Sequence, residues 1–557
     1  MSVRICVAQS VEELKFILSN TKKVDVVCVP LNLSTQLFCI INKINFYNPI
    51  NYITNDFYRD ALLESENLIC KIDAKNLKFE SHIKEYKILI RYKFYSAVFL
   101  IELIEKINLK ERIDEIYVSG WNRYIDKYSS KNYFVSNLLY SLINDIKIIS
   151  LSKSETDSIA SRDEKKYEIQ NKKLDKDKNY ILMNNIGYNF KRIVFVFLRK
   201  KYYIIIPSFS KISFFKKKIF RILKIIFIEF NASSLKKEKN IIIPDIEFFY
   251  KKKNLSKILS FRKDQEIGNL IKLKNQSRAI DNLFDMLNIK LTISNATRGI
   301  DGYYLEKSKN KNIPSVCIPH GTLAPSFNKF DKIYKNIVAE LYTIKESKYF
   351  AVQSKITKKF VESNSFGTSA TETGNLIFSE RKKTNGKKIL FAVTLKDFYN
   401  FHFLGVEMYY EFLDNLYLLN KLSKEHNLDF LVKPHPSENR CFDDLKKTFA
   451  NLEFTKKSIS KALKNAFVTI SFSSTVIEDS LHSNIPVILL DRWKRYKHCN
   501  SEENVNKKNS AIYYVSNENN LVNCLSTIKS SENICFSEHI FPDNTKKNIN
   551  NLINKLL

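Results

Sequence analysis

The feature that most constrains the fold is a repeated alternation of short, apolar, β-branched runs with longer amphipathic segments. In residues 1–150, the runs predict buried strands over 3–8, 24–30, 113–119 and 146–151. Apolar residues at helical spacing lie between them, over 11–18 and 134–143. Alternation of strand and helix predicts a parallel, doubly wound sheet with helices on its faces.

The same rhythm returns after residue 290, in two successive units. The first unit predicts strands over 291–294, 314–318 and 349–353, with helices over 303–308 and 354–363. The second predicts strands over 388–393, 430–432, 467–471, 486–490 and 511–515, with helices over 406–426, 474–482 and 517–528. A Lys-rich stretch at 381–388 separates the units and is the predicted domain boundary, because charges and turn formers cluster there.

The chain has 557 residues, which is more than one hydrophobic core of about 250–300 residues can serve. We therefore expect an α/β protein with two Rossmann-like domains facing across a cleft. The predicted parts are an N-terminal α/β, acceptor-side region (1–150), a charged linker with a basic, apolar insertion (151–265), the remainder of the N-terminal Rossmann-like domain (266–380), a C-terminal nucleotide-donor domain (386–540) and a terminal helix (541–557). Within the linker, residues 162–178 are predicted to be a solvated helix or a mobile connector.

The charge balance is strongly basic, with 90 Lys and Arg against 59 Asp and Glu, a net charge of +31. Such a charge favours a polyanionic partner. The chain is also crowded with Lys, Asn and Ile, as an AT-rich coding bias would produce, and such a bias is the alternative source of part of the charge. In residues 191–230, Lys and Arg interrupt strongly apolar runs. Two interpretations stay open for this segment: a surface in peripheral contact with an anionic membrane, or core elements with solvated lysines.

Cysteine usage and hydropathy point to the cytoplasm. The nine cysteines include no C-x-x-C pair and lie mostly in apolar runs, which argues against a disulfide scaffold and a structural zinc site. The N-terminus has no signal-peptide pattern, and no window of about 20 residues is free of charge, so no transmembrane helix is expected. The expected location is the cytoplasm, or the inner face of the cytoplasmic membrane.

Three motifs contain side chains that can bind a ligand or transfer a proton, and each motif follows a predicted strand. After Ser471, the residues Ser473, Ser474 and Thr475 open a helix, and hydroxyls beside the unpaired N–H groups of a helix start can bind phosphate. An ordinary capped helix is the alternative.

The second motif is Lys433-Pro434-His435-Pro436. Its prolines hold the histidine in an extended turn, where Lys433 and His435 can both donate hydrogen bonds to phosphate oxygens.

The third motif is Pro319-His320-Gly321-Thr322, in which His320 can accept a proton from an acceptor hydroxyl. The alternative for the second motif is a solvated surface turn, and the alternative for the third is a histidine that caps a loop.

Together these motifs resemble bacterial cytosolic transferases of the two-Rossmann (GT-B) type that build capsules, lipopolysaccharide and teichoic acids. That group includes polysialyl- and Kdo-transferase-like enzymes and CDP-glycerol glycerophosphotransferases. The resemblance covers about residues 290–500 and rests on four motifs in the group's order, which are His320 to Thr322, Thr373 to Asn375, Lys433 to Pro436 and Ser473 to Asp479.

The resemblance implies a role for each matching residue. His435, with Lys433, would contact the donor phosphate, and Ser473, Ser474 and Thr475 would bind it. Glu478 would lie near the ribose or base, and Thr394 would add a phosphate contact. His320 would act on the acceptor. Asp301 is a second catalytic candidate, although the sialyltransferase type has an acidic pair before its glycine and Ile300-Asp301-Gly302 has one acid.

The predicted function is transfer of a sugar or sugar acid from a nucleotide donor, with a CMP-sugar favoured, to a surface polysaccharide or lipid-linked glycan. No Asp-x-Asp motif stands at a strand end, so no metal and no cofactor are expected, and the helix dipole, His435 and Lys433 would stabilise the leaving phosphate. The alternatives are a CDP-polyol phosphotransferase, a UDP-sugar epimerase and a non-catalytic polyanion or nucleic-acid binder. No helix-turn-helix, RRM or zinc module supports the last, so no nucleic-acid partner is expected.

Overall fold

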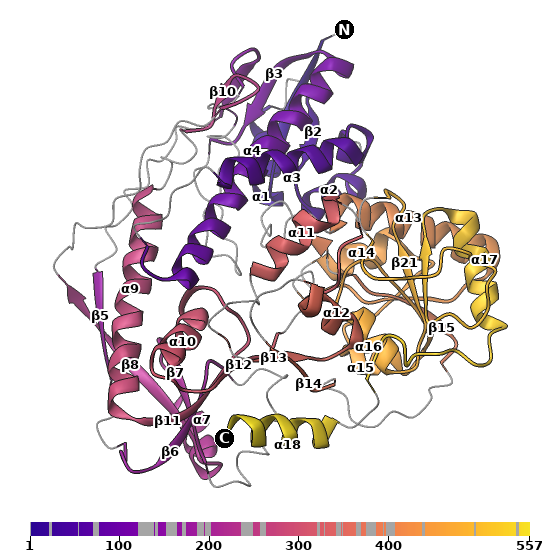
Figure 1. Cartoon of the computed structure of the whole chain (residues 1–557). Coiled ribbons are helices and arrows are strands. Elements are labelled where there is room, and N and C mark those ends of the chain that lie inside the picture. Colours follow the sequence, from indigo (N-terminus) through magenta and orange to yellow (C-terminus); the bar gives the residue numbers. More distant parts are fainter. Residues whose placement is uncertain are drawn as a thin grey trace.

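The computed structural model is an α/β protein built on three sheets of mainly parallel strands (Figure 1). It describes residues 2–21, 25–53, 55–70, 77–120, 139, 143–151, 164–169, 174–185, 194, 202–235, 249–256, 263–319, 323–327, 329–340, 347, 349–363, 369–374, 386–393, 395–396, 407–436, 441–494, 497–541 and 545–557. The predicted α/β class, with Rossmann-like domains, is confirmed.

The N-terminal sheet has the order β2-β1-β3-β4, and all its strands are parallel. Its strands are β1 (Val3–Ala8), β2 (Val27–Pro30), β3 (Ile113–Val118) and β4 (Lys147–Ser150). Its helices are α1 (Val11–Asn20), α2 (Leu33–Ile41), α3 (Asn55–Cys70) and α4 (Glu80–Glu111). The strands match the predicted ones, whereas the helix predicted over 134–143 lies almost wholly outside the described residues.

The central sheet has eight strands in the order β14-β13-β12-β11-β6-β7-β8-β5, and only β5 is antiparallel to its neighbour. The strands are β5 (Glu164–Ile169), β6 (Asn179–Met183), β7 (Tyr203–Ser208), β8 (Ile225–Leu235), β11 (Asn288–Ser294), β12 (Ser315–Cys317), β13 (Tyr349–Val352) and β14 (Ser369–Glu372). The helices between them are α7 (Phe214–Ile222), α9 (Lys263–Met286), α10 (Gly299–Asn310), α11 (Lys329–Glu340) and α12 (Lys355–Ser363).

Residues 151–265 differ from the predicted linker and insertion, because they supply strands β5 to β8 of the central sheet. Where a helix or connector is predicted at 162–178, β5 pairs antiparallel with β8. Only Tyr167 and Ile169 are large and apolar in β5, too few to give a clear strand period. Charged residues are typical of an edge strand, where they oppose further pairing.

The C-terminal sheet is wholly parallel, with the order β19-β18-β15-β20-β21-β22. Its strands are β15 (Lys388–Phe391), β18 (Phe430–Val432), β19 (Glu453–Phe454), β20 (Ala466–Ser471), β21 (Val487–Leu490) and β22 (Ile512–Val515). Its helices are α13 (Tyr409–His426), α14 (Phe442–Thr448), α15 (Ile459–Leu463), α16 (Val476–His482) and α17 (Glu518–Lys529). Numbered along the chain, the order is 3-2-1-4-5-6, which is that of the Rossmann fold.

The three sheets pack into one molecule. Helix α4 reaches the central domain, where the backbone N–H of Ser81 donates to Glu306 Oε1 of α10 at 2.7 Å. The N-terminal sheet contacts the C-terminal domain through the hydroxyl of Tyr409, which donates to the carbonyl of Pro30 at 2.5 Å. The last helix, α18 (Thr545–Leu556), returns to the central domain, where Leu552 and Leu556 join its core (Figure 1).

Among the described residues, no helix combines the length and apolar character needed to span a bilayer.

Candidate functional site

The candidate site begins at the carboxyl edge of the C-terminal sheet. Strands β15 and β20 are neighbours, and the chain continues from β15 to β18 on one side of this pair and from β20 to β21 on the other. At such a switch point the connections diverge, and open α/β sheets bind ligands in the crevice outside the strand ends there. The Lys433-to-Pro436 motif follows β18 and the Ser473-to-Thr475 motif follows β20, so the fold brings both predicted phosphate motifs to this edge.

Backbone hydrogen bonds hold the ends of these three strands in register. The N–H of Lys433 donates to the carbonyl of Phe391 at 2.9 Å, and the N–H of Ala392 donates to the carbonyl of Ile470 at 3.1 Å. The hydroxyl of Ser471 closes the edge by donating to the carbonyl of Ala392 at 2.8 Å. The loops after β18 and β20 therefore start from fixed positions on either side of β15.

The hydroxyl residues after β20 differ in their surroundings. Ser474 is buried, and its Oγ accepts a hydrogen bond from the N–H of Val476 at 3.3 Å, in the first turn of α16. Ser473 and Thr475 are half-buried. Helix α16 has 7 residues, so its dipole is short and the side chains at this edge carry more of the predicted anion binding than the dipole does.

Two basic side chains differ in exposure at the end of β18. His435 is exposed and Lys433 is half-buried. Burial lowers the pKa of the Lys433 ammonium, because a charged form loses hydration when it is buried. An anionic ligand at this edge would restore the lost stabilisation of that charge.

Glu478 in α16 contacts the central domain. Its Oε1 accepts hydrogen bonds from the hydroxyls of Ser354 and Thr357, the latter at 3.1 Å. In the structure this carboxylate joins α16 to the start of α12, and its predicted place beside a ribose or base stays a prediction.

Further contacts place the carboxyl ends of central strands against α16. Gln353 follows β13, and its carbonyl lies 3.2 Å from His482 Nε2. The side-chain amide of Gln353 donates to the carbonyl of Pro319, after β12, at 2.9 Å. The carboxyl edges of the central and C-terminal sheets therefore lie towards each other.

The central sheet has its own switch point, between β6 and β11. Asn184 follows β6 and Asn295 follows β11, and the Asn184 amide nitrogen donates to Asn295 Oδ1 at 2.5 Å. Asp301 lies beside them in the first turn of α10. Burial raises the pKa of Asp301 to about 6, while a hydrogen bond from Asn184 and the charge of Arg298 oppose that rise. A carboxyl group with this pKa can exchange a proton near neutral pH.

Gly302 explains why a glycine follows Asp301. A Cβ at this position would lie 2.3 Å from the backbone carbonyl oxygen of Thr297, which is closer than any side chain allows. The absence of a side chain lets the first turn of α10 approach the end of β11, and this approach sets Asp301 at the sheet edge.

Several predicted residues lie outside the described residues. These are His320, Gly321 and Thr322, which follow β12, Thr394, which follows β15, and Asn375. The roles predicted for His320 and Thr394 stay predictions.

Sequence reasoning missed Asn184 and the contact between α11 and the loop after β21. Asn184 directly follows the apolar run Tyr180 to Met183, so the same test of polar residues after strands could have found it. Lys335 of α11 donates to the carbonyls of Lys497 and His498, each at 3.2 Å, and burial lowers its pKa to about 8. No local sequence signal marks Lys335.

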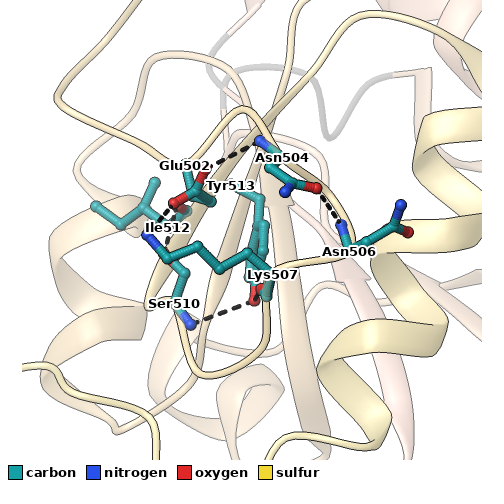
Figure 2. A network of polar contacts seen from close by, with 7 residues as sticks. All are labelled: Glu502, Asn504, Asn506, Lys507, Ser510, Ile512 and Tyr513. Atoms are coloured by element: carbon teal, nitrogen blue, oxygen red, sulfur yellow. Dashed lines mark hydrogen bonds and ion pairs between the residues drawn. The ribbon is translucent and has the colours of Figure 1, made fainter.

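A network of polar contacts links residues within the loop between β21 and β22, the loop to which Lys335 donates its hydrogen bonds. Figure 2 shows Lys507 Nζ donating to Glu502 at 2.6 Å and the hydroxyl of Tyr513 donating to the carbonyl of Lys507 at 2.7 Å. The Lys507 ammonium lowers the pKa of Glu502. The network ties residues of this loop to Tyr513 in β22.

All nine cysteines are free thiols, and only Cys70 and Cys535 are exposed. The part of the chain that the structure describes holds no group of three or more His, Cys, Asp or Glu placed to bind a metal.

Comparison with known proteins gives structural neighbours but no sequence relatives. No family model and no curated protein matches the chain. A UDP-GlcNAc 2-epimerase from Methanocaldococcus jannaschii has a TM-score of 0.39 at 12% identity, covering 68% of this chain and 99% of that one. The UDP-GlcNAc 2-epimerase from Neisseria meningitidis, solved with UDP-GlcNAc, has a TM-score of 0.38 at 12% identity, covering 68% and 99%.

A third neighbour is TarM from S. aureus, solved as a mutant in complex with fondaparinux, α-GlcNAc-glycerol and UDP. It has a TM-score of 0.37 at 11% identity, covering 68% of this chain and 97% of that one. Identities this low carry no residue roles from those proteins to this chain.

Proposed function

We propose that this chain is a GT-B-type glycosyltransferase that takes a sugar or sugar acid from a nucleotide donor. The observation that carries the proposal is the pairing of two switch points on facing sheet edges. One edge has Lys433, His435 and hydroxyl residues suited to phosphate, and the other has Asp301, a carboxyl group suited to proton transfer.

The donor phosphates would lie outside the ends of β15, β18 and β20. Lys433 and His435 would donate hydrogen bonds to the phosphate oxygens, and Ser473, Ser474 and Thr475 would bind them from the other side of β15. Charge-assisted hydrogen bonds of this kind are about twice as strong as neutral ones. They would stabilise the negative charge that develops on the leaving phosphate.

The acceptor would approach from the central sheet. As its hydroxyl oxygen forms a bond to the anomeric carbon of the donor, the bond from that carbon to the phosphate oxygen breaks, and the electron pair leaves with the nucleotide. Asp301 would take the hydroxyl proton. His320 is the alternative base, from the loop after β12.

The finer identity of the substrates rests on the sequence motifs. We favour a CMP-sugar as donor, with a surface polysaccharide or lipid-linked glycan as acceptor and no metal requirement. A CDP-polyol phosphotransferase would use the same phosphate residues. A UDP-sugar epimerase would also use them, but it would need no acceptor.

A thermal-shift screen of the full chain with CMP, CDP, UDP and GDP tests the proposal. A nucleotide at 100 times its dissociation constant should add about 2.7 kcal/mol to the free energy of unfolding, which raises the melting temperature. The matching sugar nucleotide should then release free nucleotide only when an acceptor glycan is present. Release without acceptor or conversion of the sugar alone would favour an epimerase, and no stabilisation by any nucleotide would contradict the proposal.

A further inference from the structure

Among the described residues, the exposed large apolar side chains cluster at one place, on helix α7 and directly after it. Residues 211–224, here called the basic apolar segment, connect β7 to β8 and contain α7. Five of its large apolar side chains are exposed, namely Phe214, Phe215, Ile219, Ile222 and Leu223. The other exposed large apolar residues among those described are scattered singly along the chain. Scattered residues need no explanation, whereas a cluster of this kind marks an interaction site.

Helix geometry separates an inner from an outer face of α7. Phe220 points to the central domain, where its ring meets that of Phe227 edge to face at a centroid distance of 5.4 Å. Phe215, Ile219 and Ile222 are spaced i, i+4 and i+7, so they share one face. They are 74%, 44% and 79% exposed. The helix is therefore held to the protein by one face and presents an apolar face outward.

The same segment is rich in cations. It contains six Lys and Arg and no Asp or Glu, its cations being Lys211, Lys216, Lys217, Lys218, Arg221 and Lys224. Lys217 forms an ion pair with Glu229 of β8. Lys218 and Arg221 are exposed, and neither has an ion pair among the described residues. The surface therefore combines an apolar stripe with uncompensated positive charge.

We propose that the basic apolar segment docks this protein on an anionic membrane surface. The apolar side chains of α7 would enter the boundary between headgroups and acyl chains, while Lys218 and Arg221 would lie at lipid phosphates. The occupant is a bilayer because the surface needs both properties at once. A nucleic acid would complement the charge but would leave the aliphatic residues Ile219 and Ile222 in water.

The segment also lies near the carboxyl edge of the central sheet, where Asn184 and Asp301 lie. Helix α7 begins shortly after the carboxyl end of β7, and β7 is the neighbour of β6, whose carboxyl end carries Asn184. Docking through α7 would therefore hold the edge with Asp301 near the membrane, where a lipid-linked acceptor would lie. This last step rests on the proposed function, but the docking itself does not.

Vesicle co-sedimentation of the full chain tests the docking. We expect the protein to pellet with vesicles of phosphatidylcholine containing about a third phosphatidylglycerol, at roughly physiological salt, and to stay in solution with phosphatidylcholine alone. The double variant Phe215→Ser/Ile222→Ser should bind the anionic vesicles roughly tenfold more weakly or worse, because both apolar side chains are lost from the bilayer boundary. Lys218→Glu/Arg221→Glu should weaken binding by at least about fivefold for each cation.

Matched variants elsewhere on the surface control for charge and hydropathy. Leu109→Ser removes an apolar side chain that is 87% exposed on α4, and Lys446→Glu/Lys447→Glu changes the net charge equally on α14. Both should bind as the wild type does. Circular dichroism would check that every variant is folded, and nucleotide binding measured separately would keep this test apart from the proposed function.

Two results would overturn the docking proposal. One is equal binding of the wild type and the Phe215→Ser/Ile222→Ser variant to anionic vesicles. The other is a preference for duplex DNA over vesicles that the apolar substitutions leave unchanged, which would assign the charge to a nucleic-acid partner.

Discussion

Asp301 shows how burial can prepare a side chain for proton transfer. Burial raises its pKa to about 6 from the ordinary value of 3.8. The folded protein therefore binds this proton more tightly than the unfolded chain does. Asp301 stabilises the fold most when the pH is below the unfolded pKa, and this contribution is lost as the pH rises through about 6.

Asp301→Asn should therefore change how stability depends on pH. Because asparagine does not titrate, the variant should gain stability relative to the wild type between pH 5 and pH 8, by roughly 1–1.5 kcal/mol. Urea unfolding at the two pH values measures this gain. Asp285→Asn is the control, since Lys311 lowers the pKa of Asp285, and it should show no such gain. Parallel pH profiles for Asp301→Asn and the wild type would contradict the assignment.

Kinetics can distinguish Asp301 from His320 as the base. If Asp301 takes the acceptor proton, Asp301→Asn should lower turnover by about 10²–10⁴-fold and remove the acid limb of the pH–rate profile near pH 6. Donor affinity should be unchanged. His320→Ala with the same loss, while Asp301→Asn keeps near-wild-type turnover, would move the role to His320.

At the scale of elements, α12 and α16 hold the facing domains together through Glu478. Glu478→Ala removes the acceptor for the hydroxyls of Ser354 and Thr357. Urea unfolding should show a loss of roughly 1.5–3 kcal/mol, the range for hydrogen bonds to charged groups. Ser354→Ala should reproduce part of this loss, while Glu425→Ala, in an exposed position of α13, should not. Unchanged stability with weakened nucleotide binding would instead favour the predicted contact with ribose or base.

The sequence predicts a strand or helix well where its own apolar pattern is clear, and poorly where charged residues interrupt that pattern. The strands of the C-terminal sheet are short apolar runs between amphipathic helices, and their position is close to that predicted for β15, β18, β20, β21 and β22. Strands β7 and β8 also correspond to apolar runs. The lysines between these runs mean that the sequence alone cannot decide whether residues 191–230 are core elements or a membrane-contacting surface. The strands are core, whereas α7 between them carries the exposed apolar face.

The candidate site is predictable only where its residues follow strands in sequence. Lys433 and His435 come directly after β18, and Ser473 and Ser474 after β20, so parallel pairing alone brings them together. Glu478 meets Ser354 across two domains, 124 residues apart. No local pattern encodes such a contact, because it depends on how the finished domains pack.

At the scale of the whole molecule, we expect catalysis without a divalent ion. The proposed donor site relies on Lys433, His435 and hydroxyl groups, which stabilise a leaving phosphate by hydrogen bonding and charge. Turnover should therefore survive EDTA. Complete loss of turnover with EDTA and its recovery with Mg²⁺ or Mn²⁺ would contradict this expectation.

The central claim is that the facing edge of the C-terminal sheet binds a nucleotide phosphate. Isothermal titration of the full chain with the nucleotide that stabilises it most tests this claim directly. His435→Ala and Ser474→Ala should each weaken binding by roughly tenfold to a hundredfold, the equivalent of one hydrogen bond to a charged group. His426→Ala, an exposed histidine at the end of α13, should bind as the wild type does. Unchanged affinity in folded His435→Ala and Ser474→Ala would contradict the claim.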